Sequence, residues 1–360
     1  GANKNSTKII GDHTDKYIQA YFQYDSKKTG GVTISHLRFG DKPIKSPYYI
    51  NKADFVACHN PSYVVKGYKM VNDVKPGGIF LINCQWSDAE LDHHMPAEAK
   101  RYIAKNNIQL YTINAIDKAI EIGMGKRTNT ILQSAFFALA NIMPAEAIDA
   151  GKDAIHKVEV PASWADAVDN GEKPVLEGRP ATIKMVQEIM EPVAKMDGDS
   201  LPVSAFADHV DGQFEQGASA YEKRGVAVTV PEWHPENCIQ CNQCAFVCPH
   251  ATIRAFAMDK DEVAKAPEAL KSVKMNGKGC EEYQFSIAIS PLDCMGCGVC
   301  AKVCPMAAKE NKALVMVPQE SQAAQQDVFN YAVNNVTKKE NMPAETTVKG
   351  SQFNQPLLEF

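Results

Sequence analysis

The sequence CIQCNQCAFVCP at residues 238–249 returns as CMGCGVCAKVCP at residues 294–305. Both stretches have the spacing Cys-x2-Cys-x2-Cys-x3-Cys-Pro, and each cysteine recurs 56 residues later, as Cys294 follows Cys238. Each run is followed by an apolar strand candidate, at Ala251–Met258 and at Ala313–Val317. A repeat at one fixed offset indicates two copies of a supersecondary unit, related by a pseudo-twofold axis.

The spacing within each run predicts iron–sulfur chemistry. Three thiolates on one tight loop can reach three corners of a cubane, whereas the fourth corner needs a ligand from another direction. The fourth cysteine, followed by proline, leaves the loop and points toward the other cluster. We therefore predict two [4Fe–4S] clusters with crossed ligation. One is assigned to Cys238, Cys241, Cys244 and Cys304, and the other to Cys294, Cys297, Cys300 and Cys248.

Zinc and disulfides are the alternatives for so many cysteines. Structural zinc prefers two separated Cys-x2-Cys pairs, and secreted disulfide scaffolds are usually short chains with their cysteines spread out. Eight of the eleven cysteines here fall in the two runs, which favours clusters in a reducing cytosol. The remaining three stand alone. Cys58 and Cys84 end apolar stretches and are expected to be small buried hydrophobic residues, and Cys280 has no predicted role.

The first 165 residues predict a doubly wound α/β domain. Short apolar runs that end in polar turns are typical of buried parallel strands, and helix-length segments lie between them. Strands are predicted at Tyr17–Tyr24, Asp54–Cys58, Gly78–Cys84 and Ile108–Ile113, and a mostly buried helix at Asn129–Asn141.

The rest of the chain is more polar outside the repeat. Residues 163–230 contain scattered Pro and Gly, with loops expected at 197–200 and 211–212, and predict a connecting segment with a small core. Residues 319–360 are rich in Gln, Asn and Lys and predict an extended arm.

Composition excludes several classes of protein. The 360 residues include 38 Lys and Arg against 43 Asp and Glu, a formal net charge of −5, and no basic block carries interleaved aromatics. This balance does not indicate a nucleic-acid surface. The longest apolar stretch, Ile131–Met143, is too short to span a bilayer, so we expect no membrane and a cytoplasmic location.

The motifs together resemble a known family. Gly1-Ala2-Asn3-Lys4-Asn5-Ser6-Thr7-Lys8-Ile9-Ile10 is similar to the second half of a Gly-rich segment in the single-chain pyruvate:ferredoxin (flavodoxin) oxidoreductases. The stretches Tyr24–Lys28 and Gly30–Arg38 follow it as they do in that family. Tyr221-Glu222-Lys223-Arg224 matches the family's small connecting domain, and the double cysteine run comes next.

The resemblance implies a domain order for the whole chain. An α/β domain with a truncated N-terminus would occupy residues 1–165 and a connecting (EKR) domain 166–230. An α+β ferredoxin-like domain with two [4Fe–4S] clusters would occupy 231–318, and an arm, 319–360, would lead to a thiamine diphosphate domain outside this sequence. The chain is therefore expected to be a fragment of a longer polypeptide.

Such enzymes oxidise pyruvate with thiamine diphosphate and magnesium, pass the acetyl group to coenzyme A, and send electrons through three clusters to ferredoxin or flavodoxin. The resemblance implies that this piece relays electrons through two of those clusters and works with the other domains in a homodimer. The sequence contains no Gly-Asp-Gly motif, so thiamine diphosphate, Mg²⁺ and the third cluster are expected in the missing parts. The piece alone is not expected to be catalytically competent.

Coenzyme A contacts are expected at two places in the α/β domain. Asn3, Lys4 and Lys8 lie at a turn expected to open a helix, where backbone N–H groups can receive phosphate. Asn114 follows a predicted strand, at the sheet edge where α/β domains bind ligands. The alternative is an ordinary turn with solvated lysines.

Two other functions remain open from the sequence. The chain could be a stand-alone two-cluster electron carrier without catalysis, or its clusters could only hold the fold together. A natural polypeptide that runs far past both ends of this sequence would favour the oxidoreductase.

Overall fold

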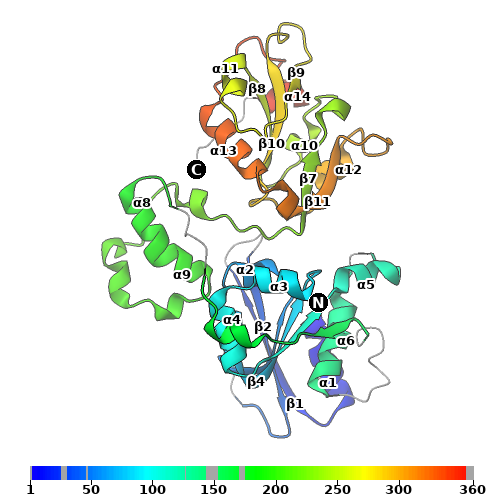
Figure 1. Ribbon diagram of the computed structural model, residues 1–360, viewed down its shortest axis with the longest axis vertical. Coiled ribbons are helices and arrows are strands. Elements are labelled where there is room, and N and C mark those ends of the chain that lie inside the picture. Colours follow the sequence, from blue (N-terminus) through cyan, green and yellow to red (C-terminus); the bar gives the residue numbers. More distant parts are fainter. Residues whose placement is uncertain are drawn as a thin grey trace. The chain divides into compact units, whose positions relative to one another are not determined.

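The computed structural model describes residues 2–25, 31–45, 48–125, 127–142, 153–169 and 175–353 (Figure 1). Residues 1–215 and 216–360 form two compact units. Each is described here by itself.

The first unit is built around an open four-stranded sheet. Its strand order is β3-β4-β5-β6, with β3, β4 and β5 parallel and β6 antiparallel to β5. These strands are β3 (Ala53–Cys58), β4 (Val74–Asn83), β5 (Gln109–Ile113) and β6 (Ile155–Lys157). The first three confirm the apolar runs as parallel strands, because uninterrupted apolar residues allow burial on both faces.

Helices cover both faces of this sheet. On one face Phe80 and Ile82 pack with Leu91 and Ile103, and on the other Leu81 packs among residues of the helices that follow β5. The first face carries α3 (Asp88–His94) and α4 (Ala97–Lys105), and the second α5 (Ala115–Glu121) and α6 (Asn129–Ala140). Short helical turns α2 (Ser62–Val65), η1 (Lys69–Asp73) and η3 (Ala162–Asp166) complete the layer around the first face. This arrangement confirms the predicted α/β domain.

A hairpin lies outside this sheet. It consists of β1 (Tyr17–Tyr24) and β2 (Thr33–Gly40), paired antiparallel, and α1 (Ala2–His13) packs on it. Ile10 of α1 and Phe137 of α6 are buried together there. Strand β1 was predicted within the doubly wound sheet, but among the described strands it pairs with β2 and lies outside that sheet.

The connecting region is more regular than its composition predicted. A helix runs from Pro180 to Ala194 through α8 (Pro180–Met185), the π-helical turn η4 (Val186–Met190) and α9 (Glu191–Ala194). Pro180 starts it because proline is tolerated in the first turn of a helix. Three 3-10 turns follow, η5 (Gly198–Ser200), η6 (Val203–His209) and η7 (Ala218–Tyr221), the last of them in the second unit.

The second unit consists of two interleaved halves. Strand β7 of the first repeat pairs with β11 of the second, and β8 of the first pairs with β10 of the second. A short β9 extends the β8-β10 pair. These strands are β7 (Thr229–Trp233), β8 (Ile253–Met258), β9 (Val273–Lys274), β10 (Gln284–Ile289) and β11 (Leu314–Pro318). The exchange gives each repeat a strand in both sheets, as a pseudo-twofold requires.

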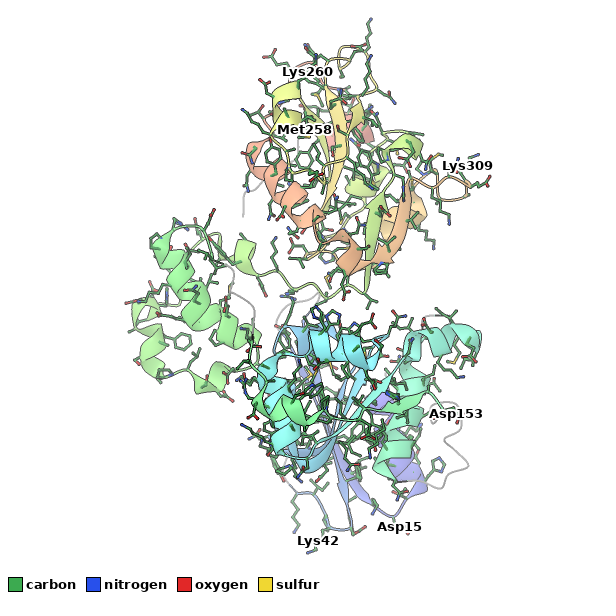
Figure 2. The ribbon with its side chains drawn as sticks, in the orientation of Figure 1. Asp15, Lys42, Asp153, Met258, Lys260 and Lys309 are labelled. Atoms are coloured by element: carbon green, nitrogen blue, oxygen red, sulfur yellow. The ribbon has the colours of Figure 1, made fainter. Side chains whose placement is uncertain are left out.

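Short helices lie before, within and after the cysteine runs. They are η8 (Pro235–Asn237), α10 (Gln243–Phe246), α11 (Lys260–Ala264) and α12 (Val299–Val303). Met258 is buried within the unit, whereas Lys260 and Lys309 point outward to solvent (Figure 2).

The predicted extended arm is wrong for the part of it that the structure describes. Residues 319–353 fold within the second unit and form η9 (Gln319–Gln322), α13 (Gln325–Asn335) and α14 (Val348–Ser351). In α13, Val328 and Ala332 are buried against Phe256 and Ala288 of the sheet. The apolar residues of α13 recur at helical spacing, but the polar residues between them made the segment look solvated.

Candidate metal centres

The two cysteine loops have matching backbones. Gln240 and Gly296, at equivalent positions of the repeat, adopt φ of 58° and 67°, and Asn242 and Gly298 adopt 58° and 72°. These left-handed residues turn successive N–H groups inward. The Gln240 N–H donates to Cys238 Sγ at 3.4 Å, and the Gly296 N–H donates to Cys294 Sγ at the same distance.

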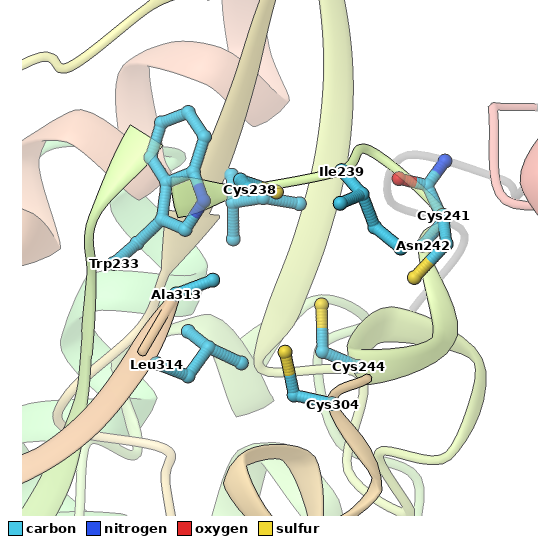
Figure 3. A pocket seen from close by; sticks show the side chains of 10 residues that line it. Trp233, Cys238, Ile239, Cys241, Asn242, Cys244, Cys304, Ala313 and Leu314 are labelled. Atoms are coloured by element: carbon cyan, nitrogen blue, oxygen red, sulfur yellow. The ribbon is translucent and has the colours of Figure 1, made fainter. Parts of the chain in front are cut away.

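The eight cysteines line two separate pockets. Around the first, Figure 3 shows the sulfurs of Cys244 and Cys304 directed into a common space, with Cys241 across from them. The first pocket contains Cys238, Cys241, Cys244 and Cys304, and the second contains Cys248, Cys294, Cys297 and Cys300. Each pocket thus takes three cysteines from one run and the fourth from the other. This is the grouping that the crossed assignment requires.

Burial favours the neutral form of four of these thiols when no metal is bound. It raises the pKa of Cys238, Cys244 and Cys294, and it raises the pKa of Cys300 to about 12. Neighbouring cysteines add to the effect, and Cys300 of the second pocket acts on Cys244 of the first. The pockets are therefore close enough to interact. Metal binding has to displace the thiol protons.

The residues present fit iron–sulfur clusters. Each pocket offers four sulfur ligands, and apolar side chains such as Leu314 and Ile253 form much of the rest of its wall. Among the described residues, no group of three or more His, Cys, Asp or Glu side chains lies close enough together to hold a single metal ion. A cubane presents its irons at four separate corners, so its thiolates can stand around a wider space than the ligands of one zinc ion.

Polar groups that the sequence did not predict surround the first pocket. Trp233 is 4% exposed, and its indole Nε1 makes no hydrogen bond to any residue that the structure describes. Lys349 of α14 lies near Cys238 and Cys241, and burial lowers the pKa of its ammonium group. Its Nζ donates to the Asn276 carbonyl at 2.5 Å. No motif indicated these residues, because they approach the pocket only through tertiary packing.

The predicted coenzyme A residues are placed in two different elements. Asn3, Lys4 and Lys8 lie within α1 rather than in a turn, and both lysines are exposed. Asn114 is the N-cap of α5, where its side chain accepts from the Asp117 N–H at 3.1 Å. Within the described ranges, no hydrogen bond or ion pair joins either lysine to Asn114. Asn114 thus caps the N-terminus of α5, and its role in ligand binding stays a prediction.

The three isolated cysteines are all buried. Burial raises the pKa of Cys58 to about 12 and that of Cys84 to about 11, as expected for small core residues. Cys280 donates to the Asn341 carbonyl at 3.1 Å, which ties its loop to the C-terminal segment.

Comparison with known proteins identifies three regions in order. Residues 1–159 match the family described as pyruvate ferredoxin/flavodoxin oxidoreductase, 169–227 match a domain of unknown function named EKR, and 237–308 match a 4Fe-4S dicluster domain. The order of these regions and the match of residues 1–159 show that the chain is similar to a segment of the pyruvate:ferredoxin/flavodoxin oxidoreductases. The resemblance stated from the motifs and the expected iron–sulfur content are thereby confirmed.

Curated oxidoreductases of this family match the chain over its full length. The chain is 48% identical to the pyruvate:ferredoxin oxidoreductase of Moorella thermoacetica and 46% identical to the pyruvate-flavodoxin oxidoreductase of Klebsiella pneumoniae. It covers 32% of each of them, so it spans about a third of the length of these relatives. It is also 38% identical to the mitochondrial NADP(+) pyruvate dehydrogenase of Euglena gracilis and covers 21% of it. No helix among the described residues is both long and apolar enough to cross a membrane.

Proposed function

We propose that this segment relays electrons through two [4Fe–4S] clusters inside an enzyme that oxidises pyruvate to acetyl-coenzyme A. The observation that carries the proposal is the partition of the eight cysteines into two pockets of four, each drawing on both runs. Bound clusters would supply one-electron redox chemistry at each pocket.

The chain's own residues would hold the two clusters in a fixed relationship. Cys244 of α10 and Cys300 of α12 lie on helices that pack against each other, and each comes two residues after a left-handed loop residue, Asn242 or Gly298. Because β7 pairs with β11 and β8 with β10, the two loops are locked to one another by the sheets. A rigid, short separation is what repeated electron transfer between two sites requires.

The remaining parts of the reaction belong to the proposal as well. Thiamine diphosphate, Mg²⁺ and a third cluster would be held by other domains of the enzyme, and ferredoxin or flavodoxin would accept the electrons. Coenzyme A would contact the α/β domain at Asn3, Lys4, Lys8 and Asn114. The full-length enzyme would work as a cytoplasmic homodimer. The names and whole-chain identities of the relatives support this assignment.

The test is reduction of a viologen dye by the full-length protein with pyruvate and coenzyme A. Dye reduction that needs both substrates, together with about eight iron and eight sulfide per copy of this segment, would support the proposal. Stoichiometric zinc without sulfide would rule out the clusters. Clusters without pyruvate-dependent reduction would favour a stand-alone carrier.

A further inference from the structure

The end of the EKR region runs along the second cysteine loop. The Gly225 N–H donates to the Leu292 carbonyl at 2.7 Å, and the Gln319 N–H donates to the Val228 carbonyl at 3.1 Å. Ala227 and Val230 are buried together with Cys294. Residues 223–230 therefore form a strap over the loop that begins the second run, and we call them the strap.

An ion pair joins the strap to the residue before the first cysteine of that run. Lys223 Nζ lies 2.5 Å from Asp293 Oδ2, and Ser290 Oγ donates to the same carboxylate oxygen at 2.7 Å. The two charged side chains are only 29% and 31% exposed. Partial burial lowers the effective dielectric constant, so each charge interacts more strongly with its neighbours than it would in open water.

The internal repeat shows that this pair is particular to the second loop. The position equivalent to Asp293 in the first run is Asn237, a neutral residue whose Nδ2 donates to the Lys312 carbonyl at 3.1 Å. The second run thus carries a negative charge next to a cluster cysteine, and the strap supplies the matching positive charge.

The backbone of the second loop is also adapted to the strap. A Cβ at Gly296 would lie 2.8 Å from the Thr229 carbonyl oxygen and 3.2 Å from the Ala227 Cβ. The equivalent Gln240 in the first run keeps a full side chain, which bonds to Lys274 and Asn276 instead. Only a glycine at 296 lets the strap approach this closely.

We propose that Lys223 is a positioning residue for the second metal centre, and that it sets how readily this centre accepts an electron. The inference rests on the proposed function and gives the EKR motif a task. Reduction adds negative charge to a centre, so an uncompensated carboxylate at Asp293 would oppose it. Lys223 neutralises the negative charge of that carboxylate and fixes the backbone that leads into Cys294.

The test is a redox titration of the full-length, cluster-loaded enzyme, followed by electron paramagnetic resonance. K223M should lower the midpoint potential of the centre held by Cys294, Cys297 and Cys300, and D293N should raise it. The double variant K223M/D293N should return close to the wild-type value, and K223R should keep it. A loss of packing alone would not give shifts of opposite sign. K223M should also lose its iron to a chelator about threefold faster.

Two controls make the result decisive. K184M removes Lys184, which pairs with Asp208 on the exposed surface of the same EKR region, and should leave both potentials unchanged. The centre held by Cys238, Cys241 and Cys244 should stay unchanged in every variant. If the wild-type enzyme carries clusters but K223M and D293N shift in the same direction or not at all, the inference is overturned. If the wild-type enzyme carries no clusters, the proposed function itself fails. If K223M does not fold, D293N still tests the sign of the shift, since a potential that stays unchanged or falls in D293N would overturn the inference.

Discussion

Trp233 is buried, and its indole nitrogen lies on the side of the ring that faces Cys238 (Figure 3). The nearby N–H opposes the rise in the pKa of the Cys238 thiol that burial causes, yet its geometry falls short of a hydrogen bond. A buried donor that bonds to no described residue is costly, and the Cys238 thiolate of a bound cluster would offer it an acceptor.

We therefore expect W233F to lower the potential of the first centre. An N–H donor favours the more negative, reduced state of a cluster, and one such bond is worth about 1 kcal/mol, or on the order of 40 mV for one electron. Phenylalanine keeps the aromatic contact with Phe285. Redox titration of the variant checks this, with the second centre as the internal control. Equal shifts in both centres would point to a general loosening of the fold.

Crossed ligation predicts that a substitution in one run damages the centre of the other. Cys248 belongs to the first run but lines the pocket of Cys294, Cys297 and Cys300. C248A should therefore alter the spectrum of that centre and leave the centre of Cys238, Cys241 and Cys244 largely intact. The mirror variant C304A should do the reverse. Damage confined to each cysteine's own run would refute the crossing.

Glycine substitutions in the second loop should separate crowding from backbone strain. Gly296 and Gly298 both have positive φ, but a Cβ would meet the Thr229 carbonyl only at Gly296, since nothing lies within 4 Å at Gly298. We expect G298A to cost about 1 kcal/mol of unfolding free energy, and G296A to cost at least twice that. Denaturant unfolding of the iron-free protein measures both. Equal losses would mean that the strap moves aside freely.

Iron uptake by the metal-free protein should strengthen as pH rises. Burial raises the pKa of Cys238, Cys244 and Cys294, and that of Cys300 to about 12, so these four thiols are protonated at neutral pH and must release protons to bind iron. Apparent affinity should rise by up to about tenfold per pH unit for each proton released. Competition with a chelator between pH 6.5 and 8.5 measures this, provided that circular dichroism shows an unchanged fold. An affinity independent of pH would mean that the thiolates form before the metal arrives.

The lysines of α1 test the coenzyme A contact. K4A and K8A in the full-length enzyme should each raise the Michaelis constant for coenzyme A by up to about fivefold, because an exposed charge pair is worth at most about 1 kcal/mol. The decarboxylation step that precedes coenzyme A should be unaffected. K105A, which removes a lysine at the end of α4, serves as the control. Unchanged kinetics in K4A and K8A would make both lysines ordinary surface charges.

The sequence predicted most where short-range patterns determine structure. The spacing of Cys238 to Cys248 limits which sulfurs can share a centre, so the crossed grouping could be anticipated. The runs at β3, β4 and β5 are apolar enough to be recognised as buried strands. The helix from Pro180 to Ala194 and α13 were missed, because polar residues alternate with their apolar ones and the apolar faces pack only on partners distant in the sequence.

The surroundings of the centres could not be read from the sequence for the same reason. Lys349 lies 108 residues beyond Cys241 and reaches it only because α14 folds back onto the unit. The family motif drew attention to Lys223, but nothing nearby in the sequence indicated Asp293 as its partner.

The exchange of strands between the two repeats limits how small such a protein can be. A single copy of the unit would have the edges of both its strands unpaired and would supply three of the four thiols that one cluster needs. Cutting the linker between the copies would not release either one, because each completes the other's sheets. The smallest self-sufficient form of this fold is a pair of copies, whether they share one chain or come from two.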